Sequence, residues 1–163
     1  MIDFIVVNTK EYYSQVAKLA DVIWREHYIS IVGKPQVDYM LNKYQSAIAI
    51  EEQVLNGFEY FLVTYENKPI GYISMKKEVT SLFLSKIYVL SSYRGKKIGK
   101  AAMLFVERKA AEYQLKNIRL TVNINNVKAI KAYEAFGFVN VGPLVTDIGS
   151  GFVMDDYEMV KTV

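Results

Sequence analysis

The spacing of apolar residues changes along the chain, and each change predicts a different kind of element. Residues 2–7 alternate weakly between apolar and polar, which predicts a first strand. Apolar residues then recur every three or four positions, which predicts three successive helices over residues 10–31, 37–44 and 48–55. A Gly-Lys-Pro sequence at residues 33–35 separates the first two helices, since proline fits the start of a new helix.

From Phe58 onwards the apolar period becomes two. This alternation predicts antiparallel strands over residues 58–65 and 70–76, joined by a polar turn, and a third strand that ends at Leu90. A helix over about residues 97–114 follows. Its expected apolar stripe consists of Ala101, Leu104, Ala111 and Leu115, with Ile98, Ala102 and Phe105 beside it.

The last third of the chain alternates between strand and helix. It predicts a strand over residues 117–122, a helix over residues 126–136, a strand that begins over residues 138–141, and a strand over residues 152–160. The element order predicts a mixed α/β fold with three layers, in which helices cover both faces of a mostly antiparallel sheet of about seven strands. A length of 163 residues suits a single domain, which we expect to span residues 1–163.

Composition and charge exclude several classes of protein. Hydrophobic residues make up 52% of the chain, which is too many for a disordered protein, and the net charge of +3 is too small to predict nucleic-acid binding. No apolar run reaches membrane-spanning length, and no basic leader opens the chain. The chain has no cysteine, which excludes a disulfide framework, a cysteine metal site and a thiol nucleophile. We therefore expect a cytoplasmic protein without a metal, a membrane contact or a nucleic-acid partner.

Residues 84–100 combine a strand, a polar turn and the start of a helix. The turn holds two glycines and four cationic side chains, namely Arg94, Gly95, Lys96, Lys97, Gly99 and Lys100. A helix N-terminus leaves several backbone N–H groups unpaired, and the helix dipole and the cations add positive charge at the same place. The turn therefore predicts an anion site, most simply for a phosphate group. The alternative is an ordinary basic turn on a solvated surface.

Two motifs occur in the same order and structural context as in a known family. The first is Tyr-Arg-Gly-Lys-Lys-Ile-Gly-Lys at residues 93–100, and the second is Asn-Val-Lys-Ala-Ile-Lys-Ala-Tyr-Glu-Ala-Phe-Gly-Phe at residues 126–138. Together they resemble the cofactor loop (Arg/Gln-x-x-Gly-x-Gly/Ala) and the Asn-x-x-Ala-x-x-x-Tyr…Gly-Phe helix of the GNAT family of acetyl-CoA-dependent N-acetyltransferases. Lys97 stands where that family usually has glycine, so phosphate binding is expected to survive if the turn does not need a positive φ there.

The resemblance implies acetyl-CoA as the cofactor and assigns roles to the residues that match. Backbone N–H groups of the loop would hold the pyrophosphate, assisted by cationic side chains, and the strand before the loop would pair with pantetheine. The implied cofactor ligands are Ile87, Tyr88, Val89, Arg94, Gly95, Lys96, Lys97, Ile98, Gly99, Lys100, Asn123, Asn126 and Tyr133. Asn126 would also cap its helix.

Tyr133 is the implied catalytic residue. A phenol is a reasonable general acid for a departing thiolate, because its unperturbed pKa of about 10 is close to that of a thiol. The alternative is that Tyr133 is one more core aromatic residue in a chain with 13 tyrosines.

The general base has no match in the family pattern, because Ser85 and Lys86 occupy the part of the strand that often carries an acidic residue. His27 is the only histidine and titrates in a suitable range, although a satisfied surface or core histidine is an equal alternative. Glu78 lies in a turn and is expected to be solvated. Three carboxylates near the C-terminus could instead recognise a cationic substrate, namely Asp147, Asp155 and Asp156.

Trp24 and Tyr28, with Tyr39, could line the acceptor site, or they could form an aromatic stripe that packs the helices together. The resemblance implies acetyl transfer to a primary amine of a small molecule, by direct attack on the thioester. Residues 142–160, with Gly149, Gly151, Asp155, Asp156 and Met159, are also similar to a bacterial subgroup that acetylates polyamines and diamines. The alternatives are a non-catalytic CoA-binding regulatory module and an enzyme that acetylates a protein or an aminoacyl-tRNA. The apolar C-terminal strands could form a homodimer interface.

Overall fold

The computed structural model describes residues 1–163 and places helices and strands close to the positions that the apolar periods predict. The first half of the chain contains β1 (Ile2–Val6), α1 (Lys10–Val32), α2 (Lys34–Tyr44), α3 (Ala47–Leu55), β2 (Phe58–Tyr65) and β3 (Lys68–Lys77). The second half contains β4 (Ser81–Val89), a short 3-10 helix (Ser91–Tyr93), α4 (Ile98–Glu112), β5 (Asn117–Asn123), α5 (Val127–Ala135), β6 (Val139–Gly149) and β7 (Phe152–Thr162).

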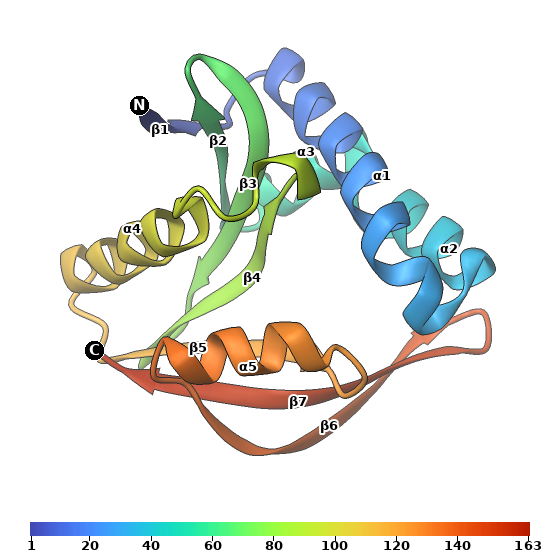
Figure 1. Cartoon of the computed structure of the whole chain (residues 1–163). Helices are drawn as coiled ribbons and strands as arrows, with labels where there is room; N and C mark the ends of the chain where they lie inside the picture. Colours follow the sequence, from blue (N-terminus) through green and yellow to red (C-terminus); the bar gives the residue numbers. More distant parts are fainter.

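All seven strands belong to one sheet with the order β1-β2-β3-β4-β5-β7-β6 (Figure 1). Neighbouring strands are antiparallel throughout, except that β4 and β5 are parallel. The parallel pair requires a crossover, which α4 supplies. The structure thus confirms the mixed α/β fold and its mostly antiparallel seven-stranded sheet.

Each face of the sheet has its own hydrophobic core, because successive side chains of a strand point to opposite faces. On one face, Tyr72 of β3 packs with residues of α1, α2 and α3 such as Ile23 and Leu41. On the other face, the next residue of the same strand, Ile73, packs with α4 residues such as Ala102. The sheet is therefore the middle of three layers (Figure 1). None of the helices has the length and apolar composition that crossing a bilayer requires.

The apolar stripe predicted for α4 is wrong in part. The helix buries the row Ile98, Ala102, Val106 and Ala110, whereas Leu104 is 49% exposed. Residues four apart lie on the same side of a helix, so this row forms a continuous contact with the sheet. Many residues of α4 are small or amphipathic, and their periodicity alone did not identify the buried side.

The strand predicted to begin over residues 138–141 continues to Gly149 and forms a long hairpin with β7. Pro143 and two glycines interrupt its apolar pattern, and almost all of its side chains are exposed, so no alternation of buried and exposed positions marks it. The hairpin turn consists of Gly149, Ser150 and Gly151, which all have positive φ. The tip of the hairpin lies against α2 (Figure 1), where Tyr39 and Lys43 donate hydrogen bonds to the carbonyl oxygen of Ile148.

Gly71 of β3 allows the close approach of β4. A Cβ at this position would lie 2.2 Å from the carbonyl oxygen of Tyr88 and 3.1 Å from the Cα of Val89. We predict that Gly71→Ala lowers the free energy of unfolding by roughly 3 kcal/mol, because the added methyl forces a backbone shift between two paired strands. Urea denaturation measures the change.

Gly99→Ala is the matched control, since a Cβ at Gly99 meets no atom within 4 Å and the residue is helical. This variant should unfold at equal or slightly higher urea concentration, because alanine is the better helix former. Equal stability of the two variants would contradict the assigned role of Gly71.

Candidate active site

The central feature of the sheet is the divergence of its two parallel strands. β4 and β5 pair only at Ser81↔Asn117, Leu82↔Ile118 and Phe83↔Arg119. Beyond these positions the strands move apart (Figure 1), and we call the unpaired part of the two strands the strand split. A β-bulge in β4 marks its beginning, because Leu84 pairs with Met75 and Lys86 pairs with Ser74, which leaves Ser85 without a partner in β3.

The edge of β4 at the strand split carries unpaired backbone groups. The N–H of Leu90 donates a hydrogen bond to the carbonyl oxygen of Ile70 on β3. Because backbone groups alternate in direction along a strand, Tyr88 also faces β3, while Ile87 and Val89 face the strand split. An extended ligand that carries amide groups can pair with this edge as an added strand would. The backbone groups of Ile87 and Val89 are therefore free to pair with pantetheine, as predicted from the sequence. The backbone groups of Tyr88 are not, because they pair with β3, and its side chain contacts Tyr28.

The loop after β4 presents a run of free donors. The backbone N–H groups from Gly95 to Lys100 donate no hydrogen bond within the chain, whereas those of Arg94 and Ala101 on either side are paired. Gly95 has a φ of 80°, and Ile98 is buried and anchors the first turn of α4 in the core. A run of N–H groups at a helix N-terminus is a suitable cradle for a phosphate.

Lys97 adopts the left-handed conformation, with φ 61° and ψ 18°, as the residue that precedes α4. The turn therefore does need a positive φ at this position, contrary to the condition under which phosphate binding was expected to survive. The lysine adopts the conformation nonetheless, at a cost of about 1 kcal/mol relative to glycine. Its N–H remains free, so the cradle is complete without the glycine that the family usually has there.

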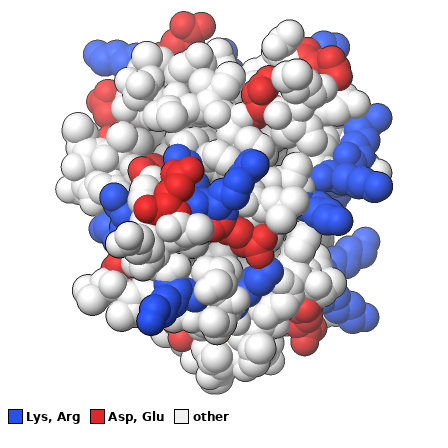
Figure 2. All heavy atoms as spheres, turned by 90° about the vertical axis from the view of Figure 1, so that its left-hand side faces the viewer, with Lys and Arg blue, Asp and Glu red and all other residues white.

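The loop is also strongly positive. Arg94, Lys96, Lys97 and Lys100 are all exposed, and none of them takes part in an ion pair. In Figure 2, Lys and Arg side chains gather along the right-hand edge, which is the side that faces the viewer in Figure 1 and on which α4 begins and α5 lies. Elsewhere in that view acidic and basic side chains are mixed. Unpaired positive charge beside free N–H groups favours a polyanionic ligand.

The other side of the strand split is formed by the end of β5 and by α5. Asn123 ends β5, and its side-chain oxygen accepts a hydrogen bond of 2.8 Å from the N–H of Asn125, so the side chain stabilises the turn. Tyr133 lies on α5, where its ring packs edge-on against Phe138 and its hydroxyl has no partner within the chain. A hydroxyl without a partner is free to donate to a ligand.

Three consecutive residues of α1 connect the two sides of the split. Glu26 accepts a hydrogen bond of 2.9 Å from Ser91, directly after β4. His27 lies 3.2 Å from the side-chain nitrogen of Asn126, which directly precedes α5. The Tyr28 hydroxyl lies 2.9 Å from the hydroxyl of Tyr88 on β4. The C-terminal half of α1 thus crosses over the strand split and holds its sides together.

The side chain of Asn126 does not cap α5, which corrects the expected capping role. It is 5% exposed, and its amide donates to Nε2 of His27. Burial, together with the charges of Arg94 and Lys128, lowers the pKa of His27, so the imidazole is neutral and Nε2 is an acceptor. Because Asn126 occupies that nitrogen, His27 is poorly placed as a general base.

Tyr28, Tyr88 and Tyr133 form a cluster of phenols around the split. Burial raises the pKa of each of them. Tyr28 raises the pKa of Tyr88 and of Tyr133 further, whereas its hydrogen bond with Tyr88 lowers its own pKa by a smaller amount than burial raises it. All three are therefore protonated at neutral pH and can act as hydrogen-bond donors. Trp24 stands behind this cluster, with 3% exposure, edge contacts to Tyr28 and Tyr88, and its indole N–H donated to Tyr72. That setting gives Trp24 a packing role, and direct contact with a substrate stays a prediction.

Asp156 on β7 is the ionisable residue whose burial the sequence pattern did not identify. It is 5% exposed, and burial, with the charge of Asp155, raises its pKa to about 6. The sequence does contain one indication of this burial. Asp156 follows Phe152 and Met154 at a spacing of two, and residues two apart share one face of a strand. By contrast, Glu78 is paired with Arg119 at 2.8 Å and Asp147 accepts from Gly149 in the hairpin turn.

Lys86 is a second ionisable group near the split. It is half-buried on the face of the sheet that α1 covers, its ammonium donates to the Ser85 hydroxyl at 2.7 Å, and burial lowers its pKa to about 8.

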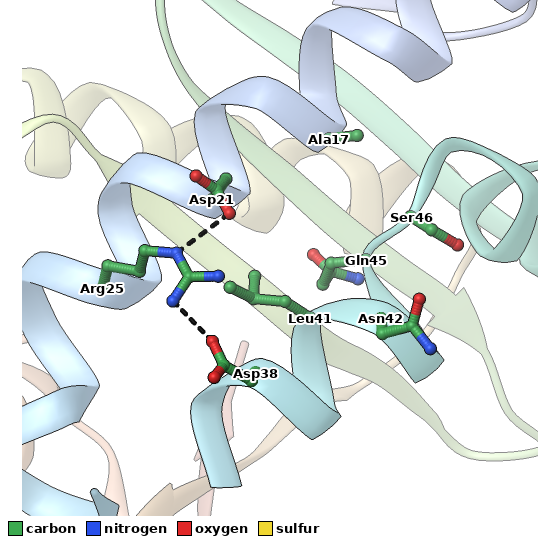
Figure 3. Close-up of a pocket in the computed structure, with 8 residues that line it drawn as sticks. All are labelled: Ala17, Asp21, Arg25, Asp38, Leu41, Asn42, Gln45 and Ser46. Atoms are coloured by element: carbon green, nitrogen blue, oxygen red, sulfur yellow. Dashed lines mark hydrogen bonds and ion pairs between the residues drawn. The ribbon is translucent and has the colours of Figure 1, made fainter. Parts of the chain in front are cut away.

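A hollow of about 300 Å³ between α1 and α2 lies apart from the strand split (Figure 3). Its charged groups are paired with one another, since Arg25 contacts both Asp21 and Asp38, and it includes no residue of the strand split.

Comparison with known proteins agrees with this geometry. Residues 17–138 match the acetyltransferase (GNAT) family, and the chain therefore belongs to that family. Among proteins of curated function, none matches the chain by sequence. The match covers the strand split, the loop before α4 and the helix that carries Tyr133. It confirms that the chain is an acetyltransferase of the family that uses acetyl-CoA.

Several solved structures share the fold. PaiA N-acetyltransferase from Thermoplasma acidophilum, solved in complex with coenzyme A, is 19% identical with a TM-score of 0.81, covering 100% of this chain and 99% of that chain. The ribosomal-protein-S18-alanine N-acetyltransferase from Escherichia coli is 14% identical with a TM-score of 0.74, at 100% and 94% coverage. Naa50 from Arabidopsis thaliana, in complex with a bisubstrate analogue, is 25% identical with a TM-score of 0.56, at 64% and 72% coverage. At these levels of identity the similarity shows the fold and does not define the acceptor of this chain.

The left-handed conformation of Lys97 leads to a stability prediction. Lys97→Gly should raise the free energy of unfolding by roughly 0.5–1 kcal/mol, because glycine adopts a positive φ without steric cost. Lys96→Gly is the control, since it removes the same charge in the same loop at a residue whose φ is not positive. Urea denaturation compares the two variants. A Lys97→Gly protein no more stable than the Lys96→Gly protein would contradict the prediction.

Proposed function

We propose that this enzyme acetylates the primary amine of a small, cationic molecule, with acetyl-CoA as the donor. The observation that supports the proposal best is the strand split itself, where an open strand edge, a run of free N–H groups and the Tyr133 phenol border the same space. Ile87 and Val89 would pair with the pantetheine, and the N–H groups from Gly95 to Lys100 would hold the pyrophosphate. Bound acetyl-CoA supplies a thioester carbon open to attack by an amine.

The residues of the chain would serve the transfer in separate ways. The β4 edge and the loop fix the position of the thioester, which removes most of the entropic cost of bringing the reactants together. The neutral phenol of Tyr133 would donate its proton toward the departing sulfur. With no cysteine in the chain, we propose direct attack by the amine without an acetyl-enzyme. Asn123 and Asn126 would line the β5 side of the cofactor site through their backbone groups.

The small size of the acceptor is inferred from what borders the strand split on the acceptor side. α1 crosses it through Glu26, His27 and Tyr28, and α2 is hydrogen-bonded to the β6–β7 hairpin through Gln36 and Tyr39. A long peptide or an RNA would need an open groove at that place. The positive charge of the acceptor is inferred from Asp156, and a diamine or polyamine is the simplest acceptor of this kind.

The acceptor class is tested by thiol release from acetyl-CoA with a panel of primary amines. The panel contains monoamines, 1,4-diaminobutane, spermidine and a short peptide with a free N-terminus. We expect the highest kcat/KM with a diamine or polyamine. Efficient acetylation of the peptide, with the small amines inert, would replace the small-molecule proposal with a protein acceptor, as in the Escherichia coli relative that acts on a ribosomal protein.

Tyr133→Phe should lower kcat by about 100-fold, which is the usual loss when a general acid is removed, while the KM for acetyl-CoA changes little. Tyr12→Phe is the control, since it removes one hydroxyl from the first turn of α1, far from the strand split. Steady-state kinetics with the best amine of the panel decides the matter. An unchanged kcat in Tyr133→Phe would remove this residue from the mechanism.

We further propose that the enzyme works in the cytoplasm. We also propose that two copies associate through β6. This strand lies at the edge of the sheet and exposes Val139, Val141 and Val145, which is typical of a strand that pairs with another chain. Sedimentation equilibrium should then give twice the monomer mass of 18.7 kDa. A monomer at all concentrations would exclude the dimer.

A further inference from the structure

Asp156 is the only charged residue among the buried side chains of the chain. A buried carboxylate normally accepts hydrogen bonds or pairs with a cation, because an unpaired charge in the protein interior is costly. Asp156 does neither within this chain, as it belongs to none of the ion pairs and accepts no side-chain hydrogen bond. A partner from outside the chain would account for this arrangement.

The direction of the Asp156 side chain follows from the strand register. Tyr157 and Met159 of β7 pack in the core under α4 and α5, so Asp156 points to the opposite face, toward α1. Its paired neighbour on β5 is Asn123, which ends that strand at the strand split. The negative charge of Asp156 is near enough to Tyr28 on α1 to raise the pKa of that phenol. Asp156 therefore lies on the acceptor side of the site, next to the phenol cluster.

We propose that the Asp156 carboxylate binds the ammonium group of the acceptor and takes its proton before acetyl transfer. The inference rests on the proposed function, since it assumes an amine acceptor. It provides the proton acceptor that the residues of β4 lack, because Ser85 and Lys86 occupy that strand where an acidic residue could have stood. Of the carboxylates that the sequence suggested for this region, Asp147 is engaged in the hairpin turn and Asp155 is exposed on the opposite face.

The groups around Asp156 suit this role. Asp155 on the same strand and the loss of water contact raise the pKa of Asp156 to about 6, so it is ionised at neutral pH yet a better base than an exposed aspartate. From α1 it is faced by Tyr28, which is protonated, and His27 on the same helix is neutral. From β5 and β6 its paired neighbours are Asn123 and Leu144, which carry no charge. Lys86, on the same face of the sheet, donates its ammonium to the Ser85 hydroxyl and pairs with no carboxylate, so Asp156 is free to pair with the ammonium group of a substrate.

The step balances as follows. An ammonium R–NH3+ gives one proton to Asp156, which becomes a neutral carboxylic acid. The free amine forms a bond to the thioester carbon, the C–S bond breaks, and the sulfur receives a proton from Tyr133, which regains one from the new amide nitrogen. Asp156 then releases its proton to water, so that one proton appears for each amide formed.

The test compares Asp156→Asn, Asp156→Glu and Asp155→Asn in the thiol-release assay, with the best amine or peptide of the panel. Asp156→Asn should lower kcat/KM by about 100-fold and abolish the acidic limb of the pH profile, which in the unmodified enzyme falls below about pH 6. Asp156→Glu should have a higher kcat/KM than Asp156→Asn and should again show the acidic limb of the pH profile. Asp155→Asn is the matched control, which should keep kcat/KM within about threefold and move the limb to slightly lower pH, since Asp155 raises the pKa of Asp156.

Stability provides a second readout that separates catalysis from folding. A carboxylate whose pKa is raised by folding destabilises the fold as pH rises from about 4, its unfolded value, to about 6. Asp156→Asn removes this penalty, so its melting temperature should exceed that of the unmodified enzyme by roughly 6–12 °C at pH 7.5 and by very little at pH 4. A variant that is more stable but inactive fits the proposal. A variant that is less stable at pH 7.5, or one with unchanged kcat/KM and pH profile, overturns it.

Failure of the proposed acceptor class gives a different result. If only the peptide reacts, the small-molecule proposal fails and Asp156 is tested on the peptide in the same way. If no amine reacts, the carboxyl 13C signal of Asp156 is followed in the CoA-bound enzyme while 1,4-diaminobutane is added. A fall in the Asp156 pKa on addition supports ammonium binding, and an unchanged titration curve overturns it.

Discussion

The structure depends on one constraint, which is that β4 and β5 pair over three positions and then separate. Paired backbone groups in a sheet satisfy each other, so a strand that leaves its neighbour needs new partners for the groups it exposes. Gly71 brings β3 close to β4, and the bulge at Ser85 turns β4 away from β5. The exposed edge at Ile87 and Val89 is left for a ligand that carries its own amide groups, and the loop directly beyond it is the anion cradle. The two halves of the proposed cofactor site are thus consequences of the same divergence.

Helix α1 determines how far the two sides are apart. Its residues Glu26, His27 and Tyr28 reach Ser91, Asn126 and Tyr88 respectively, so one rigid element connects both sides. These hydrogen bonds also bring Tyr28 between the β4 edge and the buried carboxylate of β7. The acceptor side therefore contains neutral phenols and a single buried carboxylate that the nearby Lys86 does not pair with, which is a suitable environment for an ammonium group that must lose a proton.

The sequence predicted the element order and the fold class, because these depend on local periodicity, and it located the basic turn before α4, because its residues lie close together in the chain. It did not predict the second half of β6, whose Gly142 and Pro143 break the apolar alternation of an exposed edge strand. It also missed the conformation of Lys97 and the side-chain partner of Asn126, which follow from packing between distant elements. The burial of Asp156 is of the same kind, since α1, which covers its face of the sheet, lies far from β7 in the chain. The predicted site residues therefore lie together in the fold, while the chemistry between them is set by long-range contacts.

The central claim is that the backbone N–H groups from Gly95 to Lys100 are the donors that hold the cofactor phosphates. Amide hydrogen exchange of the enzyme, measured with and without saturating coenzyme A, tests this claim most directly. The account predicts fast exchange of these amides in the free enzyme and strong protection in the complex, together with protection of Ile87 and Val89 on the β4 edge. Saturating coenzyme A that leaves the exchange of this loop unchanged, while other amides become protected, would contradict it.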